Sequence, residues 1–276
     1  MIIDGKKMAL ELYNTLQEDI RSQNIIPQLG VVLVGNNPSS LRYVEQKKKW
    51  ADFVGINIHI YNMKQNVTQI ELEKKIEEIN QNNKIDGYIV QLPLPRHINE
   101  KKIINLIDPK KDVDGFHPEN IGKLMIGDTS GFISCTPAGI VHIINTLNIE
   151  LPGKHVSIVG RSNIVGKPLA ALLINAGATV TVCNSKTPNI KNFTSTSDIV
   201  IMATGQPNLL RLDMVRIGTT IIDVGFTVID GKIYGDADYE IIEKTGSCIT
   251  PVPGGVGPLT VAMLMKNTFK ACITGE

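Results

Sequence analysis

Tyr43 and Lys47 stand four residues apart in a stretch whose apolar residues, Val44 and Ala51 among them, recur at helical spacing. Side chains four residues apart share one face of a helix, so the phenol and the amine can act on the same ligand. A lysine takes part in proton transfer at neutral pH only where burial or neighbouring charges lower the pKa of its amine. The alternative is that Lys47–Lys49 is a charge run on a solvated helix face.

Gln91 and Asp114 are two further candidates for contacts with a ligand. Gln91 ends the apolar stretch GYIVQ and precedes a proline loop, and ligands of open α/β sheets bind beyond the carboxyl ends of the strands. Asp114 belongs to the segment DVDG, and a carboxylate accepts two parallel N–H bonds from an amidine-like edge such as an aminopyrimidine ring. The alternatives are that Gln91 only ties down the proline loop and that Asp114 starts an ordinary turn.

The segment from Pro251 to Pro258 holds three glycines and three prolines in eight residues. The prolines stiffen the segment, and the glycines let the backbone approach a flat ligand closely. A purely structural turn rarely needs this composition. We therefore predict that Pro253, Gly254 and Gly255 contact a substrate.

Residues 151–187 predict a strand, a glycine turn, a helix and a second strand. Gly160 opens the turn, Gly166 follows it, Pro168 lies in the first helical turn, and Gly177 is a left-handed stop. The free N–H groups and the positive end of the helix dipole suit a pyrophosphate. The alternative is a structural βαβ unit with a solvated basic loop.

The second strand of this unit ends in the residues CNSKT at 183–187, which include no carboxylate. NAD sites usually hold the ribose hydroxyls with an Asp or Glu at this place. Hydroxyls and a cation, together with Arg161 in the first turn, suit a ribose phosphate instead. The pattern therefore favours NADP over NAD as the cofactor.

The chain ahead of this unit also alternates strands and helices, which predicts a parallel sheet with helices on both faces. A loop-rich stretch, 108–135, follows, and we place the domain boundary just after it. The predicted strands are 28–34, 57–61, 87–91, 155–159, 179–183, 199–203 and 220–224, and the predicted helices are 5–22, 39–54 with Ser39 or Ser40 as cap, 68–79 with a Thr68–Glu71 capping box, 99–107, 136–147, 168–176 and 259–271.

The composition excludes several classes of function. The chain has 276 residues with 28 basic and 27 acidic side chains, a formal net charge of +1, so neither nucleic acid nor an acidic membrane surface is an expected partner. No apolar stretch approaches the roughly 20 residues of a membrane span, and the N-terminus has no signal-peptide pattern. Four cysteines without a C-x-x-C pair indicate reduced thiols and a cytoplasmic location, and five histidines without metal spacing predict no metal site.

These motifs together resemble the bifunctional methylenetetrahydrofolate dehydrogenase/cyclohydrolase family. The resemblance covers nearly the whole chain, and VQLPLP and PGGVGPxT are highly specific to the family. The matching segments are, in order, S-x-x-Y-x-x-x-K at 40–47, VQLPLP at 90–95, KDVDGF at 111–116, CTP at 135–137, GRSxIVGxP at 160–168, DVG at 223–225, GD at 235–236 and PVPGGVGPxT at 251–260.

The resemblance implies an α/β fold of two domains with the folate in the cleft between them. An N-terminal three-layer α/β lobe, residues 1–137, binds the folate, and the C-terminal helix within 255–276 returns to it. Residues 138–254 form a Rossmann-like NAD(P)-binding domain, and the protein is a homodimer through this second domain. The implied activity is NADP-dependent oxidation of 5,10-methylenetetrahydrofolate to the 5,10-methenyl form, followed by hydrolysis to 10-formyltetrahydrofolate.

The resemblance also implies the roles of individual residues. Lys47 is the key catalytic residue, Tyr43 packs on and positions the folate, Gln91 holds Lys47 and keeps it partly neutral, and Asp114 anchors the pterin edge. The implied cofactor contacts are Gly160, Arg161 and Ser162 to the phosphates, Ser185 near the ribose phosphate, and Phe226 and Thr260 near the nicotinamide.

Some positions depart from the family pattern. Phe226 stands where the family usually has Ile, which changes the shape of the nicotinamide pocket, and Leu259 replaces a Met of similar volume. Ala237 and Tyr239 also depart from the usual pattern, with no effect that we can assign. Two alternatives remain open: another NADP-dependent dehydrogenase of the shikimate or amino-acid type, and a non-catalytic nucleotide-binding dimer.

Overall fold

The computed structural model describes residues 2–240 and 247–275, which form two compact units. The three-stranded unit comprises Glu11–Cys135 and Val261–Glu276, and the five-stranded unit comprises Met1–Leu10 and Thr136–Thr260. Three helices contribute residues to both units: α1 (Gly5–Gln23), α6 (Cys135–Thr146) and α10 (Val256–Thr274). The boundaries that we predicted, after residues 137 and 254, differ from these points and stay predictions about the functional domains.

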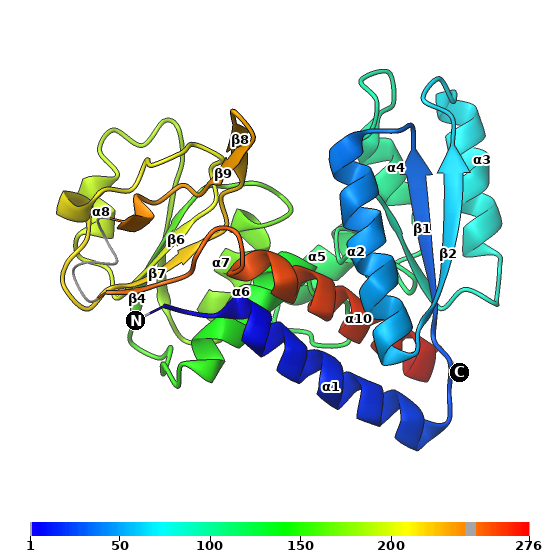
Figure 1. Ribbon diagram of the computed structural model, residues 1–276, viewed down its shortest axis with the longest axis horizontal. Coiled ribbons are helices and arrows are strands. Elements are labelled where there is room, and N and C mark those ends of the chain that lie inside the picture. Colours follow the sequence, from blue (N-terminus) through cyan, green and yellow to red (C-terminus); the bar gives the residue numbers. More distant parts are fainter. Residues whose placement is uncertain (1, 241–246, 276) are drawn as a thin grey trace. The chain divides into compact units, whose positions relative to one another are not determined.

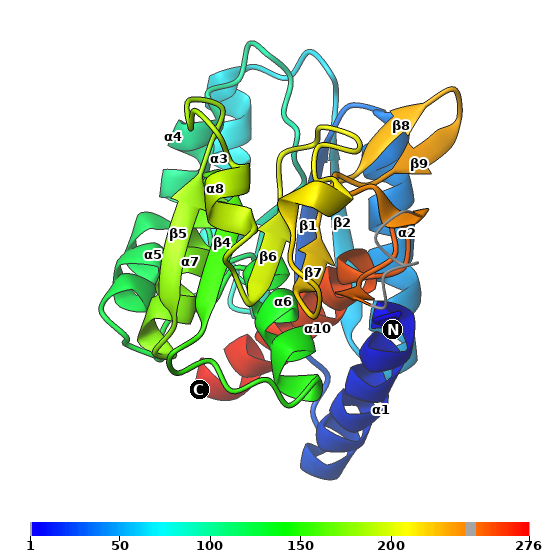
Figure 2. The same cartoon turned by 90° about the vertical axis from the view of Figure 1, so that its left-hand side faces the viewer.

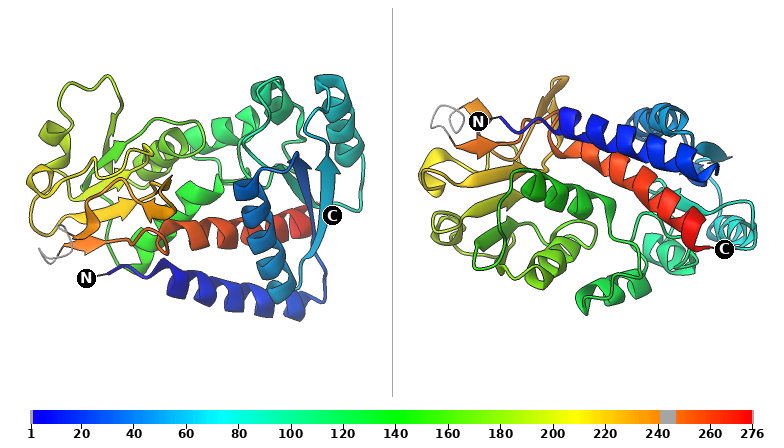
Figure 3. Two further views of the ribbon diagram at one scale, coloured as in Figure 1. Left: turned by 45° about the horizontal axis from the view of Figure 1, so that its top comes forward. Right: turned by 90° about the horizontal axis from the view of Figure 1, so that it is seen from below.

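In the three-stranded unit, β1 (Gln28–Val34) is the centre of a parallel sheet with the order β2-β1-β3 (Figure 1). It pairs with β2 (Asn57–Met63) on one side and with β3 (Gly87–Val90) on the other. The other helices of this unit are α2 (Pro38–Val54), α3 (Gln69–Asn80), α4 (Glu100–Leu106) and α5 (Pro118–Met125). Residues 11–23 of α1 run beside residues 261–274 of α10 (Figure 3).

Both faces of β1 and β3 are buried, as their nearly continuous runs of apolar residues require, whereas β2 at the edge of the sheet is exposed or half-buried along its length. Val32 and Val34 face one side, where they join a cluster with Leu72 and Ile76 of α3 and Ile103 of α4. The residues that alternate with them in β1 are buried as well, and they are Leu29, Val31 and Leu33. The predicted three-layer arrangement is confirmed.

In the five-stranded unit, β4 (His155–Val159) pairs with β5 (Thr179–Cys183) on one side and β6 (Ile199–Met202) on the other (Figure 2). The order β10-β7-β6-β4-β5 is parallel throughout, and α7 (Gly166–Asn175) connects β4 to β5. Because the chain goes from β4 to one neighbour and later returns to its other neighbour, the carboxyl end of β4 is a topological switch point. The remaining elements are α8 (Lys191–Thr194), the short 3-10 helix η1 (Leu212–Met214), β7 (Thr220–Asp223), β8 (Thr227–Ile229), β9 (Lys232–Tyr234) and β10 (Cys248–Ile249).

Several predicted helix ends are confirmed. Thr68 and Glu71 form the capping box of α3, each side chain bonding the other's backbone N–H. The Asn99 side chain caps α4. Gly55 and Gly177 adopt the left-handed conformation after α2 and α7.

Other helix ends were predicted wrongly. The cap of α2 is Asn37, whose side chain accepts from the backbone N–H groups of Ser39 and Ser40, so neither serine is the cap. Pro38 at the first helical position makes this arrangement favourable, because its missing N–H would have had no partner there. The C-terminal helix begins at Val256, before the predicted 259, and Pro258 lies inside its first turn.

Some elements lie where we predicted no helix or strand, one of them in the stretch 108–135 that we expected to be loop-rich. Residues Pro118–Met125 form α5, which begins with His117 as its cap and Pro118 at the first position. Residues Thr227–Ile229 and Lys232–Tyr234 form a hairpin, in which Asp230 and Gly231 both have positive φ as a tight two-residue turn requires.

The four cysteines all lie in the described part of the chain, and none of them forms a disulfide bond there. Within the same residues, no helix is long and apolar enough to cross a membrane.

We expect Asn37→Ala to lower the free energy of unfolding by about 1 kcal/mol, because two N–H groups of the first turn of α2 lose their acceptor. Urea denaturation measures the change. The exposed Ser39→Ala is the matched control and changes stability little, since its hydroxyl does not cap the helix. Equal losses in the two variants would contradict the assignment of the cap.

Candidate active site

The centre of the three-stranded unit's site is a hydrogen bond between Lys47 on α2 and Gln91 at the end of β3. The Lys47 Nζ donates to the Gln91 Oε1 at 2.7 Å. The Gln91 Nε2 donates to the carbonyl of Leu92 at 2.8 Å, which orients the amide so that its oxygen faces the amine. Lys47 is partly buried, whereas the neighbouring Lys48 and Lys49 are exposed. The charge-run alternative therefore holds for Lys48 and Lys49 but not for Lys47.

The surroundings of Lys47 shift its protonation towards the neutral amine. Burial lowers the pKa of Lys47, because the ammonium form loses its hydration, and the negative charges of Asp114 and Cys135 oppose that shift. Burial raises the pKa of Asp114, and the charge of Lys47 opposes this shift in turn. Burial, followed by the charge of Asp114, raises the pKa of the Cys135 thiol well above its usual value. The structure thus brings Lys47, Gln91, Asp114 and Cys135 into one electrostatic group.

The loop that carries Asp114 is anchored by the two residues before Val113. Lys111 extends to the C-terminal end of α3 and its ammonium donates to the carbonyls of Ile79, Asn80 and Asn82 at 3.2, 2.9 and 2.9 Å. Its backbone carbonyl accepts from the N–H of Tyr88, so the segment continues the sheet beside β3.

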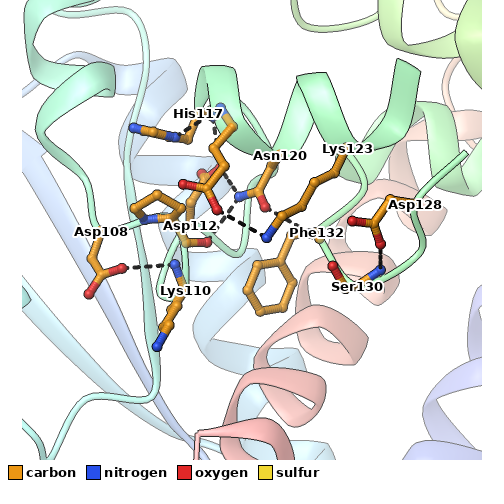
Figure 4. A network of polar contacts seen from close by, with 12 residues as sticks. Asp108, Lys110, Asp112, His117, Asn120, Lys123, Asp128, Ser130 and Phe132 are labelled. Atoms are coloured by element: carbon orange, nitrogen blue, oxygen red, sulfur yellow. Dashed lines mark hydrogen bonds and ion pairs between the residues drawn. The ribbon is translucent and has the colours of Figure 1, made fainter. Parts of the chain in front are cut away.

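Asp112 anchors the same loop to the start of α5 (Figure 4). Its Oδ2 accepts from the backbone N–H of His117 at 2.8 Å and from the side-chain amide of Asn120 at 2.9 Å. Burial raises the pKa of Asp112 to about 6, against these two hydrogen bonds. The Asn120 Oδ1 in turn accepts from the N–H of Phe132 at 3.2 Å. Asp112 therefore lies at the junction of three chain segments.

The turn after Asp114 fits tightly against the segment that leads to Cys135. Gly115 has a φ of +71°, and a side chain there would meet the backbone of Ile133 and Ser134. The Ser134 hydroxyl donates to the Gly115 carbonyl at 2.8 Å. The segment therefore does form the Asp-Gly turn of the alternative interpretation. The same turn also holds the Asp114 carboxylate near Lys47.

Tyr43 lies one helical turn before Lys47 on α2, and 44% of its surface is exposed. An exposed aromatic ring one turn from a partly neutral amine is suited to cover a flat ligand bound there.

The turn between β4 and α7 in the five-stranded unit is built from backbone alone. Gly160 has a φ of +131°, and a Cβ on it would overlap the carbonyl of Ala203. A Cβ on Gly166 would overlap the carbonyl of Gly160 in the same way. Both glycines are therefore required by the close approach of three chain segments, and the turn leaves its N–H groups near the surface.

This turn fits the phosphates of a dinucleotide. Arg161 and Ser162 are exposed, and the residue before α7, Val165, provides no side-chain cap. The Ser162 Oγ accepts from the N–H of Val165 at 3.1 Å, which shapes the turn without covering the start of the helix. The positive end of the helix dipole therefore lies beside a cation, as an anion site needs, although the N–H of Lys167 already donates to the Ser162 carbonyl at 3.1 Å.

The end of β5 carries Ser185 and Lys186, both exposed, in a turn that Asn184 and Thr187 stabilise. The N–H of Asn184 donates to the Thr187 Oγ1 at 2.9 Å, and the N–H of Lys186 donates to the Asn184 Oδ1 at 3.0 Å. The turn presents a hydroxyl and an ammonium where NAD-binding sheets present a carboxylate. The geometry suits a ribose phosphate.

Two buried carboxylates hold the loops at the carboxyl ends of β6 and β7. The Asp223 carboxylate accepts from the N–H groups of Gly225, Asp236 and Ala237 at 2.8, 3.1 and 2.8 Å. The Asp236 Oδ2 accepts from the N–H and hydroxyl of Thr204 at 2.6 and 2.8 Å. Burial raises the pKa of Asp223 to about 6. The DVG and GD motifs are therefore structural supports of this edge of the sheet.

Phe226 follows the Asp223 loop and is 48% exposed at that edge. Thr260 lies in the first turns of α10 in the same unit, and its hydroxyl lies 3.0 Å from that of Thr136. Leu259, the departure from the family's Met, is fully buried and packs against Gly139.

Pro253, Gly254 and Gly255 belong to the five-stranded unit, in the turn that leads into α10. The N–H of Gly255 donates to the carbonyl of Pro251 at 2.8 Å, and a Cβ on Gly5 would overlap the carbonyl of Gly255. The close packing against α1 accounts for part of this unusual composition. The contact of these three residues with a substrate stays a prediction.

Several residues of the site were not predicted as functional. Cys135 was expected only to be a buried thiol, and its electrostatic coupling to Asp114 has no signal in the local sequence. Asp112 and Asn120 were missed as supports, although buried polar residues in an otherwise apolar pattern are a usable signal. His117 is a helix cap, which agrees with the expectation that the histidines are structural. Among the described residues, no group of three His, Cys, Asp or Glu side chains could hold a metal ion.

The sequence matches two family descriptions, one for each part of the chain. "Tetrahydrofolate dehydrogenase/cyclohydrolase, catalytic domain" matches residues 3–114, and "Tetrahydrofolate dehydrogenase/cyclohydrolase, NAD(P)-binding domain" matches residues 134–275. The Bifunctional protein FolD of Acetivibrio thermocellus is 47% identical over 274 residues, which cover 98% of this chain and 96% of that protein.

Solved structures give the same result. The bifunctional methylenetetrahydrofolate dehydrogenase/cyclohydrolase FolD of Campylobacter jejuni has a TM-score of 0.97 at 44% identity, covering 100% of this chain and 99% of that one. The FolD structure of Trypanosoma brucei, complexed with NADP cofactor and inhibitor, has a TM-score of 0.94 at 35% identity, covering 100% and 98%. The shikimate dehydrogenase of Aquifex aeolicus is only 13% identical at a TM-score of 0.55, over 90% and 92% of the two chains, which shows a shared fold alone.

We expect the Lys47 amine to titrate below the ordinary lysine range, because burial removes hydration from its charged form. Competitive labelling with trace acetic anhydride across the alkaline range, read by mass spectrometry, measures this pKa, and the exposed Lys48 is the internal control for the reagent. Asp114→Asn should lower the pKa of Lys47 further, since the carboxylate raises it. A Lys47 that titrates as an ordinary lysine in both proteins would contradict the geometry.

Proposed function

Since this chain belongs to the tetrahydrofolate dehydrogenase/cyclohydrolase family, we propose that it is the bifunctional enzyme that converts 5,10-methylenetetrahydrofolate to 10-formyltetrahydrofolate in two steps. It oxidises the methylene compound to 5,10-methenyltetrahydrofolate with NADP, and it then hydrolyses the methenyl compound. The observation that carries the residue assignments is the partly buried Lys47 amine, held by Gln91 and facing the charge of Asp114.

The hydrolysis requires proton transfer, and Lys47 is suited to provide it. Water attacks the methenyl carbon and loses a proton, which leaves a hydroxyl on that carbon. The bond from the carbon to one ring nitrogen then breaks, this nitrogen gains a proton, and the hydroxyl loses its proton as the formyl C=O forms, so that one proton is released overall. An amine with a lowered pKa can accept the first proton and return one to the leaving nitrogen. The Gln91 oxygen accepts from the amine at 2.7 Å and fixes its direction without adding charge.

Asp114 and Tyr43 are proposed to hold the folate. The Asp114 carboxylate accepts two N–H bonds from the aminopyrimidine edge of the pterin. The exposed ring of Tyr43 covers the flat pterin one helical turn from Lys47. We retain Pro253, Gly254 and Gly255 as further substrate contacts, on the basis of the family resemblance.

NADP, when bound, accepts the hydride of the first step. The turn of Gly160, Arg161 and Ser162 is proposed to hold its phosphates, and Ser185 its ribose phosphate. Support comes from the uncapped helix N-terminus and from the hydroxyl and ammonium at the end of β5. Phe226 and Thr260 are proposed to line the nicotinamide side. The functional domains on this proposal are 1–137 with 255–276 for the folate and 138–254 for NADP.

The assembly and compartment also follow from the family resemblance. We propose a homodimer through the NADP-binding domain and a cytoplasmic location, the latter supported by four cysteines that form no disulfide among the described residues.

The direct test is spectrophotometric. Purified protein with 5,10-methylenetetrahydrofolate should reduce NADP. In a parallel assay with NAD the reaction should be slower, because NAD binds more weakly. A protein that binds NADP without turnover would support the non-catalytic alternative, and turnover that folate analogues do not inhibit would support a dehydrogenase of another type.

Lys47→Met should reduce the rate of methenyltetrahydrofolate hydrolysis by about 100-fold or more, because the proton carrier is lost. The decay of methenyl absorbance measures the rate, and circular dichroism checks the fold. Lys48→Met is the matched control and keeps the wild-type rate, since Lys48 is exposed on the same helix. Normal hydrolysis by Lys47→Met would remove Lys47 from the mechanism.

Ser185→Asp should raise KM for NADP by about tenfold, because a carboxylate repels the ribose phosphate, and a factor of ten corresponds to about 1.4 kcal/mol. KM for NAD should stay unchanged or fall, since a carboxylate at this place suits ribose hydroxyls. Ser185→Ala separates the loss of the hydroxyl from the added charge. Unchanged discrimination between NADP and NAD in Ser185→Asp would exclude Ser185 from the ribose-phosphate site.

A further inference from the structure

Asn267 is a polar residue in the part of α10 that belongs to the three-stranded unit, and its side chain contacts the loops of the candidate active site. Its Nδ2 donates to the carbonyl of Val113 at 2.9 Å and to the carbonyl of Ile133 at 2.9 Å. The same nitrogen lies 3.7 Å from the Cys135 Sγ. Val113 precedes Asp114, and Ile133 lies two residues before Cys135, so one amide touches both segments that carry charge-coupled side chains.

The chemistry of an amide matches this position closely. The NH₂ group has two hydrogens, and each one has a carbonyl acceptor within hydrogen-bond distance. Val113 is completely buried, so its carbonyl would lose a partner in a region that water does not reach. A carboxylate of the same shape has no hydrogen to donate and would face two carbonyl oxygens.

The Asn267 bonds complete a symmetrical support around Asp114. On the C-terminal side of Asp114, the Ser134 hydroxyl donates to the carbonyl of Gly115 at 2.8 Å. On the N-terminal side, Asn267 joins the carbonyl of Val113 to that of Ile133. Asp114 is therefore tied to the 133–134 segment through both of its chain neighbours, and one of the two ties comes from α10.

A second residue on α10 also forms hydrogen bonds to the segment 129–132, which leads to Cys135. Lys270, one turn beyond Asn267, donates to the carbonyls of Thr129 and Gly131 at 3.1 and 2.7 Å, and its ammonium lies 5.3 Å from the centre of the Phe132 ring. These contacts end at Phe132, three residues before Cys135. Asn267 extends the same support to the residues next to Asp114.

We propose that Asn267 is a positioning residue of the active site, whose two hydrogen bonds set the place of the Asp114 carboxylate relative to Lys47 and to the bound pterin. The inference rests on the proposed function for its kinetic consequences. It does not rest on that function for its effect on Lys47, which is measurable without substrate.

Asn267→Asp tests the proposal, because it keeps the shape of the side chain and removes both donors. We expect kcat/KM for methenyltetrahydrofolate to fall by about tenfold or more, as loss of two buried hydrogen bonds implies, with a raised KM for folate and an unchanged KM for NADP. The pH midpoint of Lys47 labelling should shift as well. If Asn267→Asp does not fold, the same kinetic and labelling measurements are made on Asn267→Ala.

Thr268→Ala is the matched control. Thr268 is the next residue of α10, is completely buried, and donates within the helix to the carbonyl of Leu264 at 2.9 Å. Its loss lowers stability without touching the loops of the site. It should therefore leave KM for folate and the Lys47 midpoint at wild-type values.

A double-mutant cycle with Asp114→Asn separates positioning from a general structural effect. If Asn267 acts through Asp114, Asn267→Asp should change kcat/KM by less than about twofold when Asp114 is already replaced. Full, independent losses in the double variant would overturn the proposal, as would kinetics and labelling equal to those of Thr268→Ala. A wild-type protein without folate turnover would refute the proposed function alone, and the Lys47 labelling would still decide the role of Asn267.

Discussion

The removal of the Lys47 ammonium from water is the interaction on which the catalytic unit depends. A desolvated ammonium is unstable unless a partner compensates it, and a direct carboxylate contact would stabilise the charge and keep the amine protonated. The structure instead gives the amine a neutral acceptor, the Gln91 oxygen, at 2.7 Å and leaves Asp114 as an opposing charge. The direction of the amine and its readiness to lose a proton are therefore controlled by two different residues.

This division explains why the loop around Asp114 is so heavily anchored. The charge of Asp114 opposes the effect of burial on Lys47, so its distance from the amine has chemical consequences. Lys111 ties the loop to the end of α3, Asp112 ties it to α5, and Ser134 supports the turn at Gly115. The KDVDGF motif is thus mainly a set of anchors around the Asp114 carboxylate.

The sequence was sufficient to predict the contacts between residues that lie close together along the chain, because their spacing shows which side chains share a face. Helical spacing placed Tyr43 and Lys47 on one helix face, and the α/β alternation predicted parallel sheets, whereas the pairing of Lys47 with Gln91 was implied only by the family resemblance. The sequence was insufficient for Asn120 and Asn267, because most of their partners are backbone carbonyls or N–H groups that any residue carries, and the one carboxylate partner, Asp112, shows no pairing with Asn120 in the local pattern. Asn267 lies 154 residues from its partner Val113. The helix α5 was missed because its Gly122 weakens the helical pattern, although Pro118 at its start was a readable signal.

The glycines of the five-stranded unit differ in how freely they can change during evolution. At Gly160 and Gly166 the obstacle to a side chain is backbone, the carbonyls of Ala203 and Gly160, and no second substitution can remove a carbonyl. At Gly235 the obstacles are side chains, chiefly the carboxylate of Asp223, whereas at Gly225 the backbone nitrogen of Asp236 adds to its carboxylate. Gly235 and Asp223 can therefore in principle change together through compensating replacements. The turn between β4 and α7 does not allow such compensating replacements. Its backbone shape should therefore be retained even where the exposed residues of the turn change.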